Sequence, residues 1–169
     1  MKEIELKGIN GIGKVALVDD EDYEYLNQTE WKGRKSGHDT YYAIGKGRGG
    51  LLMHRMIMNV NNQFDYVDHI DGNGLNNQKS NLRICTPLQN SQNRKPHVKS
   101  TSKYLGVHIE KFKMKNGIKK CYRAQIQING ISKHIGLFPL TIEGEIAAAK
   151  AYDQFAIEHH KEFANPNFK

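Results

Sequence analysis

Residues 67–93 constrain the fold more than any other part of the chain. A short apolar strand is expected to end on Asp68 and His69, and a polar loop follows in which Gly72 and Gly74 permit positive φ angles. A second short strand is expected after the loop. The stretch therefore predicts two strands joined by a loop, with a carboxylate and an imidazole in adjacent positions at the end of the first strand.

The second strand, expected over residues 81–85, leads into a predicted helix. Thr86 suits the N-cap of this helix and Pro87 its first position, and Gln89 lies where its amide can reach back to the cap. Asn90 then lies in the first helical turn. The strands and the helix together can bring the Asn90 side chain close to the acid and the histidine of the first strand.

Asp68, His69 and Asn90 form a set suited to the hydrolysis of a phosphodiester. Carboxylate and amide oxygens are hard ligands of the kind that Mg²⁺ and Mn²⁺ prefer, so we assign one divalent ion to Asp68 and Asn90. A histidine titrates near neutral pH and can take a proton from an attacking water. His69 is therefore the expected general base.

Residues 51–93 resemble the HNH nuclease motif, also called the ββα-metal or His-Me finger motif, with His69, Asn81 and Asn90 at its signature positions and Asp68 as their acidic neighbour. The similarity is closest to the homing endonucleases of phages and introns. It implies a catalytic metal-dependent DNA endonuclease whose products carry 5′-phosphate and 3′-hydroxyl ends. It also implies that Asn81 holds the loop or orients His69.

Several residues around the motif are expected to contact the DNA backbone near the cut. The resemblance includes a Met-His-Arg run upstream of the first strand, which favours Arg55 over His54 for such a contact and leaves a packing role for His54 open. Asn76 and Asn77 are interpreted as loop-capping residues. The expected DNA-contacting residues of this part of the chain are His54, Arg55, Arg83, Asn93 and Arg94.

The charge of the chain favours an anionic partner. Its 169 residues carry a formal net charge of +7, and between Lys99 and Lys133 nine basic residues stand against one acid, Glu110. So one-sided a segment points to nucleic acid, and double-stranded DNA is the expected partner. The two cysteines, Cys85 and Cys121, form no CxxC pair, so no structural zinc is expected. No small-molecule cofactor is expected either.

No apolar run approaches the length of a membrane span, and residues 1–14 lack the apolar core of a secretory signal. We therefore expect a protein without membrane contact that works in the cytoplasm, which would be that of a bacterial host if a phage encodes it. The sequence leaves open whether the protein is a monomer or a homodimer.

The predicted fold class is α+β, built from separate modules. The N-terminal module is expected to be small and β-rich with one short helix, and Trp31, Tyr41 and Tyr42 are interpreted as its core. The expected boundaries are 1–50 for this module, 51–95 for the nuclease core, 96–102 for a basic linker and 103–169 for a C-terminal module.

The sequence of the C-terminal module predicts a three-stranded antiparallel sheet packed on one helix. Asn129-Gly130, between two alternating segments, is the strongest short hairpin signal in the chain. Thr141 is expected to cap the helix that follows the third strand. The face of this helix toward the sheet is expected to hold Gly144, Ala147, Ala148, Ala151 and Phe155.

Residues 102–168 resemble the Apetala-two/ethylene-response-factor (ERF) DNA-binding domain, through motifs such as Tyr104-x-Gly106-Val107 and Asn165-Pro166-Asn167-Phe168. The resemblance implies a sheet that lies in the DNA major groove. The usual second-strand tryptophan of that family is Tyr122 here, and much of its arginine set is lysine or histidine, so base specificity does not transfer. The expected DNA contacts are Arg123, Gln125 and Gln127, supplemented by His108, Lys111, Lys113, Lys133 and His134.

Two functions are compatible with this sequence. The first is a metal-dependent endonuclease that cuts double-stranded DNA at a recognised site, as a mobile or homing enzyme does. The alternative is a non-catalytic, sequence-specific DNA-binding regulator in which the HNH segment is only a scaffold. The intact set of Asp68, His69 and Asn90 favours the enzyme. The target sequence, and whether one or both strands are cut, stay open.

Overall fold

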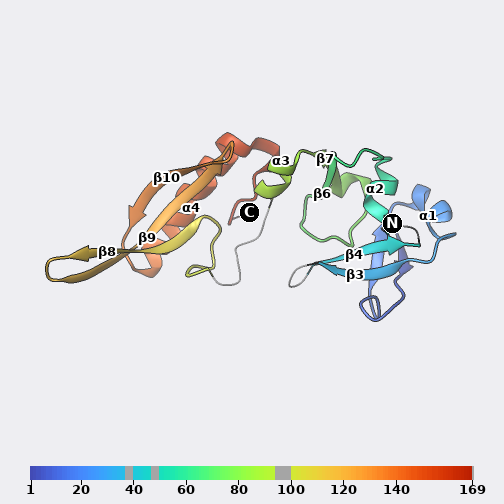
Figure 1. The fold of residues 1–169 in the computed structure, drawn as a ribbon, viewed down its shortest axis with the longest axis horizontal. Helices are drawn as coiled ribbons and strands as arrows, with labels where there is room; N and C mark the ends of the chain where they lie inside the picture. The colour runs from blue at the N-terminus through green and yellow to red at the C-terminus, as the bar shows by residue number, and fades with distance from the viewer. Residues whose placement is uncertain (37–39, 47–49, 94–99, 169) are drawn as a thin grey trace. The chain divides into compact units, whose positions relative to one another are not determined.

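The computed structural model describes residues 1–36, 40–46, 50–93 and 100–168. The chain forms two compact units, Met1–Asn90 and Ser91–Lys169, and each is described by itself. Both units combine helices with small antiparallel sheets, in agreement with a mixed α and β fold (Figure 1). Arg94 and part of the expected linker, 96–99, lie outside the described residues.

The described residues of the first unit form three small sheets. Strand β1 pairs with β2, strand β4 lies between β3 and β5, and β6 pairs with β7. Its elements are β1 (Lys2–Glu5), β2 (Val15–Val18), α1 (Asp20–Leu26), β3 (Lys32–Ser36), β4 (Thr40–Gly45), β5 (Leu51–Leu52), α2 (Met53–Ile57), β6 (Tyr66–His69), the 3₁₀ turn η1 (Lys79–Asn81), β7 (Leu82–Cys85) and α3 (Pro87–Gln92), whose last two residues belong to the second unit.

One continuous core joins the N-terminal strands to the segment that carries Asp68 and His69. Trp31 is buried in this core, as predicted, and its indole nitrogen donates to the Leu26 carbonyl at 2.8 Å. Met53 of α2 and Leu82 of β7 belong to the same buried cluster as the N-terminal strand residues. The expected N-terminal module and the expected nuclease core therefore share one hydrophobic core.

The second unit is a three-stranded antiparallel sheet covered on one face by a long helix (Figure 1). Strand β9 (Gly117–Ile128) lies between β8 (Val107–Met114) and β10 (Ile131–Phe138), and α4 (Ile142–His160) follows, ending in the short turn η2 (Lys161–Phe163). Asn129 and Gly130 have φ angles of 50° and 80°, as the predicted tight hairpin requires. The Thr141 hydroxyl accepts from the Gly144 amide at 3.1 Å, which confirms the predicted cap.

The face of α4 that packs on the sheet differs from the predicted one. Gly144 and Ala148 are buried as predicted, and Phe155 packs partly buried against the core, but Ala147 is exposed and Ala151 only partly buried. Tyr152 and Ala156, which were not predicted, complete the buried face. When alanines lie on several sides of a helix, the hydrophobic periodicity does not show clearly which face packs on the sheet. The largest side chain then decides how the helix is rotated about its axis. Here Tyr152 sets the phase by lying against the backbone of Gly106.

Candidate active site

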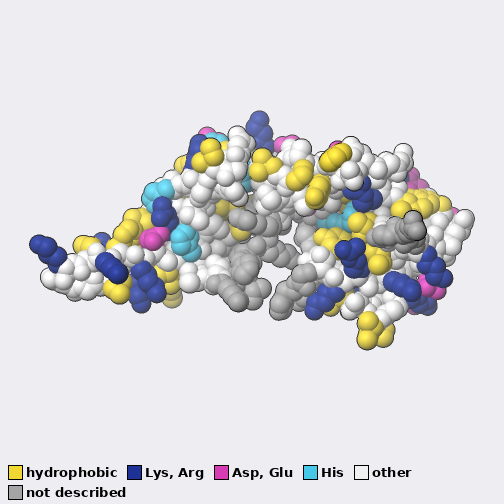
Figure 2. Space-filling view, in the orientation of Figure 1, with side chains coloured by type: hydrophobic (Ala, Val, Ile, Leu, Met, Phe, Trp, Pro, Cys, Tyr) yellow, Lys and Arg dark blue, Asp and Glu magenta, His cyan; other side chains and the backbone are white. Residues whose placement is uncertain are grey.

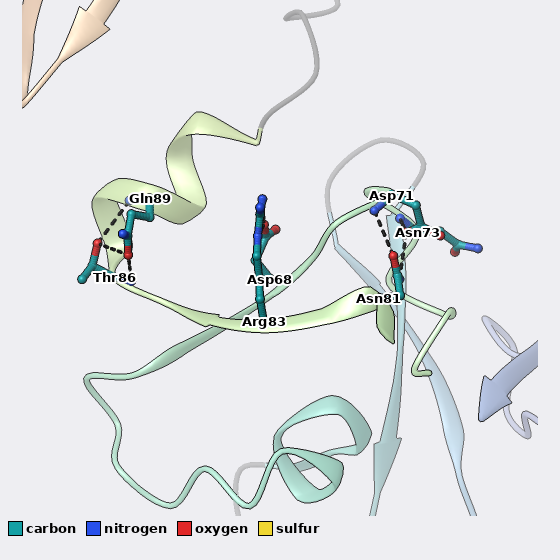
Figure 3. A network of polar contacts seen from close by, with 7 residues as sticks. All are labelled: Asp68, Asp71, Asn73, Asn81, Arg83, Thr86 and Gln89. Atoms are coloured by element: carbon teal, nitrogen blue, oxygen red, sulfur yellow. Dashed lines mark hydrogen bonds and ion pairs between the residues drawn. The ribbon is translucent and has the colours of Figure 1, made fainter. Parts of the chain in front are cut away.

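Strands β6 and β7 form an antiparallel ladder in which Asp68 lies opposite Arg83. Directly opposed side chains project from the same face of such a ladder, so the two side chains meet. Arg83 donates to Asp68 Oδ2 from Nη2 at 2.6 Å and from Nε at 2.9 Å (Figure 3). Asp68 is only 7% exposed, so the ion pair is largely shielded from water.

The helix start follows the predicted capping box. The Thr86 amide donates to Gln89 Oε1 at 2.9 Å, and the Gln89 amide donates to the Thr86 hydroxyl at 3.2 Å (Figure 3). Asn90 lies half-buried in the first turn of α3, where its backbone amide donates to the Thr86 carbonyl at 2.9 Å. The strand–loop–strand–helix order predicted for 67–93 is therefore present.

Asn81 closes the loop between β6 and β7. Its Oδ1 accepts from the Asp71 amide at 3.0 Å, and its Nδ2 donates to Asp71 Oδ1 at 3.0 Å (Figure 3). Its Nδ2 also donates to the Asn76 carbonyl at 2.8 Å. Burial would raise the pKa of Asp71, but hydrogen bonds from Asn73, Asn76 and Asn81 outweigh it and lower that pKa. Of the two roles expected for Asn81, these contacts correspond to holding the loop.

The two loop glycines serve different purposes. Gly72 has a φ of 69°, in the left-handed region where glycine was expected. Gly74 does not have a positive φ among the described glycines, so that part of the prediction is wrong. A Cβ at Gly74 would lie 2.4 Å from the Tyr41 carbonyl and 2.6 Å from the Tyr42 ring, so glycine is needed here because the loop packs directly on β4.

His69 is 5% exposed and lies among polar and aromatic neighbours. Its Nε2 is 3.3 Å from Asn77 Oδ1, and its ring centroid is 5.0 Å from that of His54 and 5.7 Å from that of Tyr42. Burial lowers the pKa of His69, although Asn77, Asp71 and Asp68 act in the opposite direction. A neutral imidazole at neutral pH is the form that a general base requires.

His54 packs behind His69 and is only 6% exposed. Its ring also contacts Tyr42 at 5.5 Å, and its Nδ1 is buried without a hydrogen-bond partner in the described part of the chain. Burial lowers its pKa to about 3, and the charges of His69 and Arg55 add to this effect. His54 is therefore an uncharged packing partner of His69, and its expected contact with DNA stays a prediction.

The other expected backbone-contacting residues occupy different places. Arg55 donates to the Asp65 carbonyl at 2.6 Å and to the Asn62 carbonyl at 2.5 Å, which fixes the segment that precedes β6. Arg83 is paired with Asp68, and Asn93 lies half-buried at the end of a described range. Contacts of these side chains with DNA stay predictions, as does that of Arg94, which the structure does not describe.

Sequence reasoning missed two residues of this site. Asn77 was interpreted as a loop cap and Tyr42 as core, yet both lie against His69. Tyr42 reaches the site from β4, and Asn77 from the loop after β6. Neither position carries a local signal, because each contact depends on how distant segments pack. The glycine at position 74 reflects this packing in the sequence, because a side chain there would collide with the Tyr42 ring.

Binding of a divalent ion by Asp68 and Asn90 stays a prediction. In the described ranges no group of three or more His, Cys, Asp and Glu side chains is placed to hold a metal. Mg²⁺ is commonly held by one or two carboxylates with waters and substrate phosphates, and Asp68 with the Asn90 amide would supply such a partial set. Cys85 and Cys121 are both buried and free.

The face of the second unit's sheet that α4 leaves uncovered carries a cluster of polar side chains. Arg123 Nη1 donates to Glu110 Oε2 at 2.8 Å, His108 Nε2 lies 3.8 Å from the same oxygen, and Arg123 Nε is buried without a hydrogen-bond partner in the described chain. The hydrogen bond from Arg123 lowers the pKa of Glu110. By strand alternation this face carries His108, Glu110, Arg123, Gln125, Gln127, Ser132 and His134.

The expected lysine contacts do not share that face. Lys111 and Lys113 alternate with Glu110 along β8, and Lys133 lies opposite the buried Ile126. Exposed lysines instead gather at the tip of the β8–β9 hairpin, as Figure 2 shows. These residues are Lys111, Lys113, Lys115, Lys119 and Lys120. We call them the lysine tip.

Comparison with known proteins identifies relatives in viruses. The chain is 36% identical over 162 residues to an uncharacterized HNH endonuclease of Acanthamoeba polyphaga mimivirus, covering 93% of this chain and 76% of the relative. A second uncharacterized HNH endonuclease of that virus is 35% identical over 77 residues, 43% of this chain and 22% of the relative. Protein 3.8 of Escherichia phage T7 is 46% identical over 46 residues, 27% of this chain and 38% of the relative.

No family model and no solved structure matches the chain. None of the helices in the described ranges is long and apolar enough to cross a membrane.

Proposed function

The chain belongs to the HNH endonuclease family, and from this we propose that it is a metal-dependent endonuclease that hydrolyses phosphodiester bonds of double-stranded DNA. The observation that carries the proposal is the buried Asp68-His69 pair at the end of β6, where the histidine is held among Asn77, His54 and Tyr42. The pairing of β6 with β7 and the capped start of α3 add support.

In the proposed reaction His69 acts as the general base. Its neutral ring takes a proton from a water molecule, and the electron pair of the broken O–H bond forms the new bond to phosphorus. The bond from phosphorus to the 3′ oxygen then breaks, and that oxygen leaves with the electron pair and takes a proton from a solvent water molecule. The products carry a 5′-phosphate and a 3′-hydroxyl.

Asp68 and Asn90 would hold Mg²⁺ or Mn²⁺, which when bound neutralises charge on the scissile phosphate and the leaving oxygen. Arg83 fixes the orientation of the Asp68 carboxylate through two hydrogen bonds to Oδ2. Asn81 keeps the loop after β6 closed. Asp68 and Asn90 would therefore act by binding the ion, and Arg83 and Asn81 by holding the site in shape, whereas proton transfer belongs to His69.

The second unit would bring the cut to a recognised site, as in a homing enzyme. The lysine tip would attract phosphates of any sequence, because such contacts depend on charge alone. The uncovered sheet face carries Gln125 and Gln127, whose amides can bond both the donor and the acceptor of an adenine in the major groove. Strands are an established means of reading a groove.

Cleavage of supercoiled plasmid tests the enzyme proposal. Wild-type protein with Mg²⁺ or Mn²⁺ should nick or linearise the DNA, and His69→Ala should bind it without cutting. His159→Ala, which changes an exposed histidine of α4, is the matched control and should cut normally. Firm binding without cleavage under any divalent ion would instead favour the non-catalytic regulator, for which the presence of Arg83 on Asp68 is the supporting observation.

A further inference from the structure

Asn77 lies at the centre of the loop after β6 and is fully buried, with 0% of its surface exposed. Its side chain makes two polar contacts. The Oδ1 atom lies 3.3 Å from His69 Nε2, and the Nδ2 atom donates to the Leu75 carbonyl at 3.2 Å. A buried amide with both ends hydrogen-bonded has one preferred orientation. The contact with His69 therefore indicates which ring nitrogen of the histidine carries the proton.

The Leu75 carbonyl fixes which end of the amide faces His69. A carbonyl oxygen can only accept a hydrogen bond, so the amide nitrogen of Asn77 must point toward it. If the amide were rotated by half a turn, its oxygen would face the Leu75 oxygen, and two acceptors would repel each other inside the protein. The Asn77 oxygen is therefore the atom that meets His69.

An amide oxygen also only accepts, so the contact is a hydrogen bond only if His69 Nε2 carries the proton. In a neutral imidazole whose Nε2 carries the proton, the lone pair that can accept a proton is on Nδ1. We propose that Asn77 is a positioning residue that fixes this tautomer of His69, so that Nδ1 is the atom that takes the proton from the attacking water. The catalytic part of this inference rests on the proposed function, whereas the tautomer does not.

The N-terminal part of the chain holds Asn77 in place. The Leu17 amide of β2 donates to the Leu75 carbonyl, and the Asn77 amide donates to the Leu17 carbonyl, both at 2.8 Å. The Asp19 carboxylate next to β2 accepts from Gln78 Nε2 at 3.2 Å and from the Lys79 amide at 2.8 Å. The N-terminal strands thus form one wall of the site, which gives the N-terminal segment a role in orienting the general base.

The neighbouring Asn76 provides a matched comparison. Its side chain donates to Asp71 Oδ2 at 2.8 Å, so it shares the loop with Asn77 but binds a different group. If Asn77 served only to close the loop, loss of either amide should affect His69 in the same way. If Asn77 fixes the tautomer, only its own loss should change the proton on the His69 ring.

The experiment is a long-range ¹H–¹⁵N correlation spectrum of the full-length, metal-free protein, in which the two ring nitrogens of His69 report its tautomer. Wild type should show the proton on Nε2. Asn77→Leu, which removes the acceptor at similar size, should show a mixture of tautomers and cut DNA about 10- to 100-fold more slowly with unchanged DNA affinity. Asn76→Ala leaves the Asn77 amide in place and should keep the wild-type tautomer.

A wild-type His69 with its proton on Nδ1 would overturn the proposal, even if Asn77→Leu failed to fold. A folded Asn77→Leu protein with the wild-type tautomer and cleavage rate would overturn it as well. Failure of the enzyme proposal would look different, since the tautomer would depend on Asn77 while neither wild type nor variant cut DNA.

Discussion

Arg83 and Asp68 face each other across the β6–β7 ladder and form a buried ion pair, with both guanidinium contacts directed to a single carboxylate oxygen at 2.6 and 2.9 Å. The expected metal ligand thus carries a cationic partner from its own ladder. Because both contacts use Oδ2, Arg83 orients the carboxylate and at the same time competes for part of the charge that a divalent ion would bind. Arg83 is therefore expected to affect both the folding stability of the site and the binding of an ion by Asp68.

Removal of Arg83 should therefore cost stability. Arg83→Gln removes the guanidinium that pairs with the buried Asp68 carboxylate, and loss of one member of a buried pair typically lowers the free energy of unfolding by about 3 kcal/mol. Urea unfolding at neutral pH measures the change. Lys46→Gln, which breaks an exposed pair with Glu30, is the control and should have little effect. Equal effects of both variants would contradict a buried, interacting pair.

Acid should destabilise the protein through the two buried histidines. Burial lowers the pKa of His54 from 6.5 to about 3 and also lowers that of His69, so the unfolded chain binds protons that the folded chain does not. The stability that His54 contributes is complete above pH 6.5 and is lost as the pH falls from 6.5 toward 3, by about 1.4 kcal/mol per pH unit. The lowered pKa of His69 acts in the same direction.

His54→Phe tests this assignment, because it keeps an aromatic ring against His69 but cannot bind a proton. Its free energy of unfolding should fall less steeply than that of wild type between pH 6.5 and 4, a difference of about 1 kcal/mol per unit. Denaturant titrations at a series of pH values provide the slopes. His159→Gln, at an exposed histidine, should retain the wild-type slope. Identical slopes for all three proteins would show that His54 does not resist protonation.

Gly106→Ala should destabilise the second unit. Gly106 has a φ of 77°, and a Cβ there would lie 2.0 Å from the Tyr152 ring, the side chain that sets the orientation of α4. Overpacking combined with backbone strain is expected to cost about 2–4 kcal/mol. Gly117→Ala is the matched control, because its φ is also positive at 130° but nothing lies within 4 Å of the added methyl group. Thermal unfolding should show a much larger loss for Gly106→Ala than for Gly117→Ala.

The lysine tip should control how DNA binding depends on salt. In a His69→Ala background, which prevents cutting, replacement of Lys113, Lys115 and Lys119 by glutamine should reduce the slope of log affinity against log salt by about 3. Fluorescence anisotropy at several salt concentrations gives the slope. Gln125→Ala should leave the slope unchanged but weaken discrimination between adenine and other bases. An unaltered slope in the triple variant would exclude the lysine tip from DNA contact.

Local features of the fold were predictable from the sequence because their causes are local. Thr86 and Gln89 form the expected capping box, and Asn129-Gly130 forms the expected hairpin turn, since a few neighbouring residues determine each geometry. The positions of Asp68 and His69 on β6 follow from the same kind of reasoning.

Features that depend on packing between distant segments were not predictable. The phase of α4 required Gly106 and Tyr152 to be placed together, and alanines on several sides of the helix concealed it. The contact of Asn77 with His69 requires Leu17 of β2 to pair with the loop after β6, and the sequence around Asn77 does not indicate that pairing. The Arg83–Asp68 pair depends on the register of β6 against β7, which short strands do not specify by alternation alone.

Single-turnover cleavage of a plasmid, with the ends mapped on both strands, tests the central claim most directly. Wild-type protein with Mg²⁺ or Mn²⁺ is predicted to give 5′-phosphate and 3′-hydroxyl ends, and chelation of the ion or His69→Ala is predicted to abolish the cut while DNA remains bound. Cleavage by His69→Ala at the wild-type rate, or cleavage that persists without a divalent ion, would contradict an endonuclease built on His69 and Asp68.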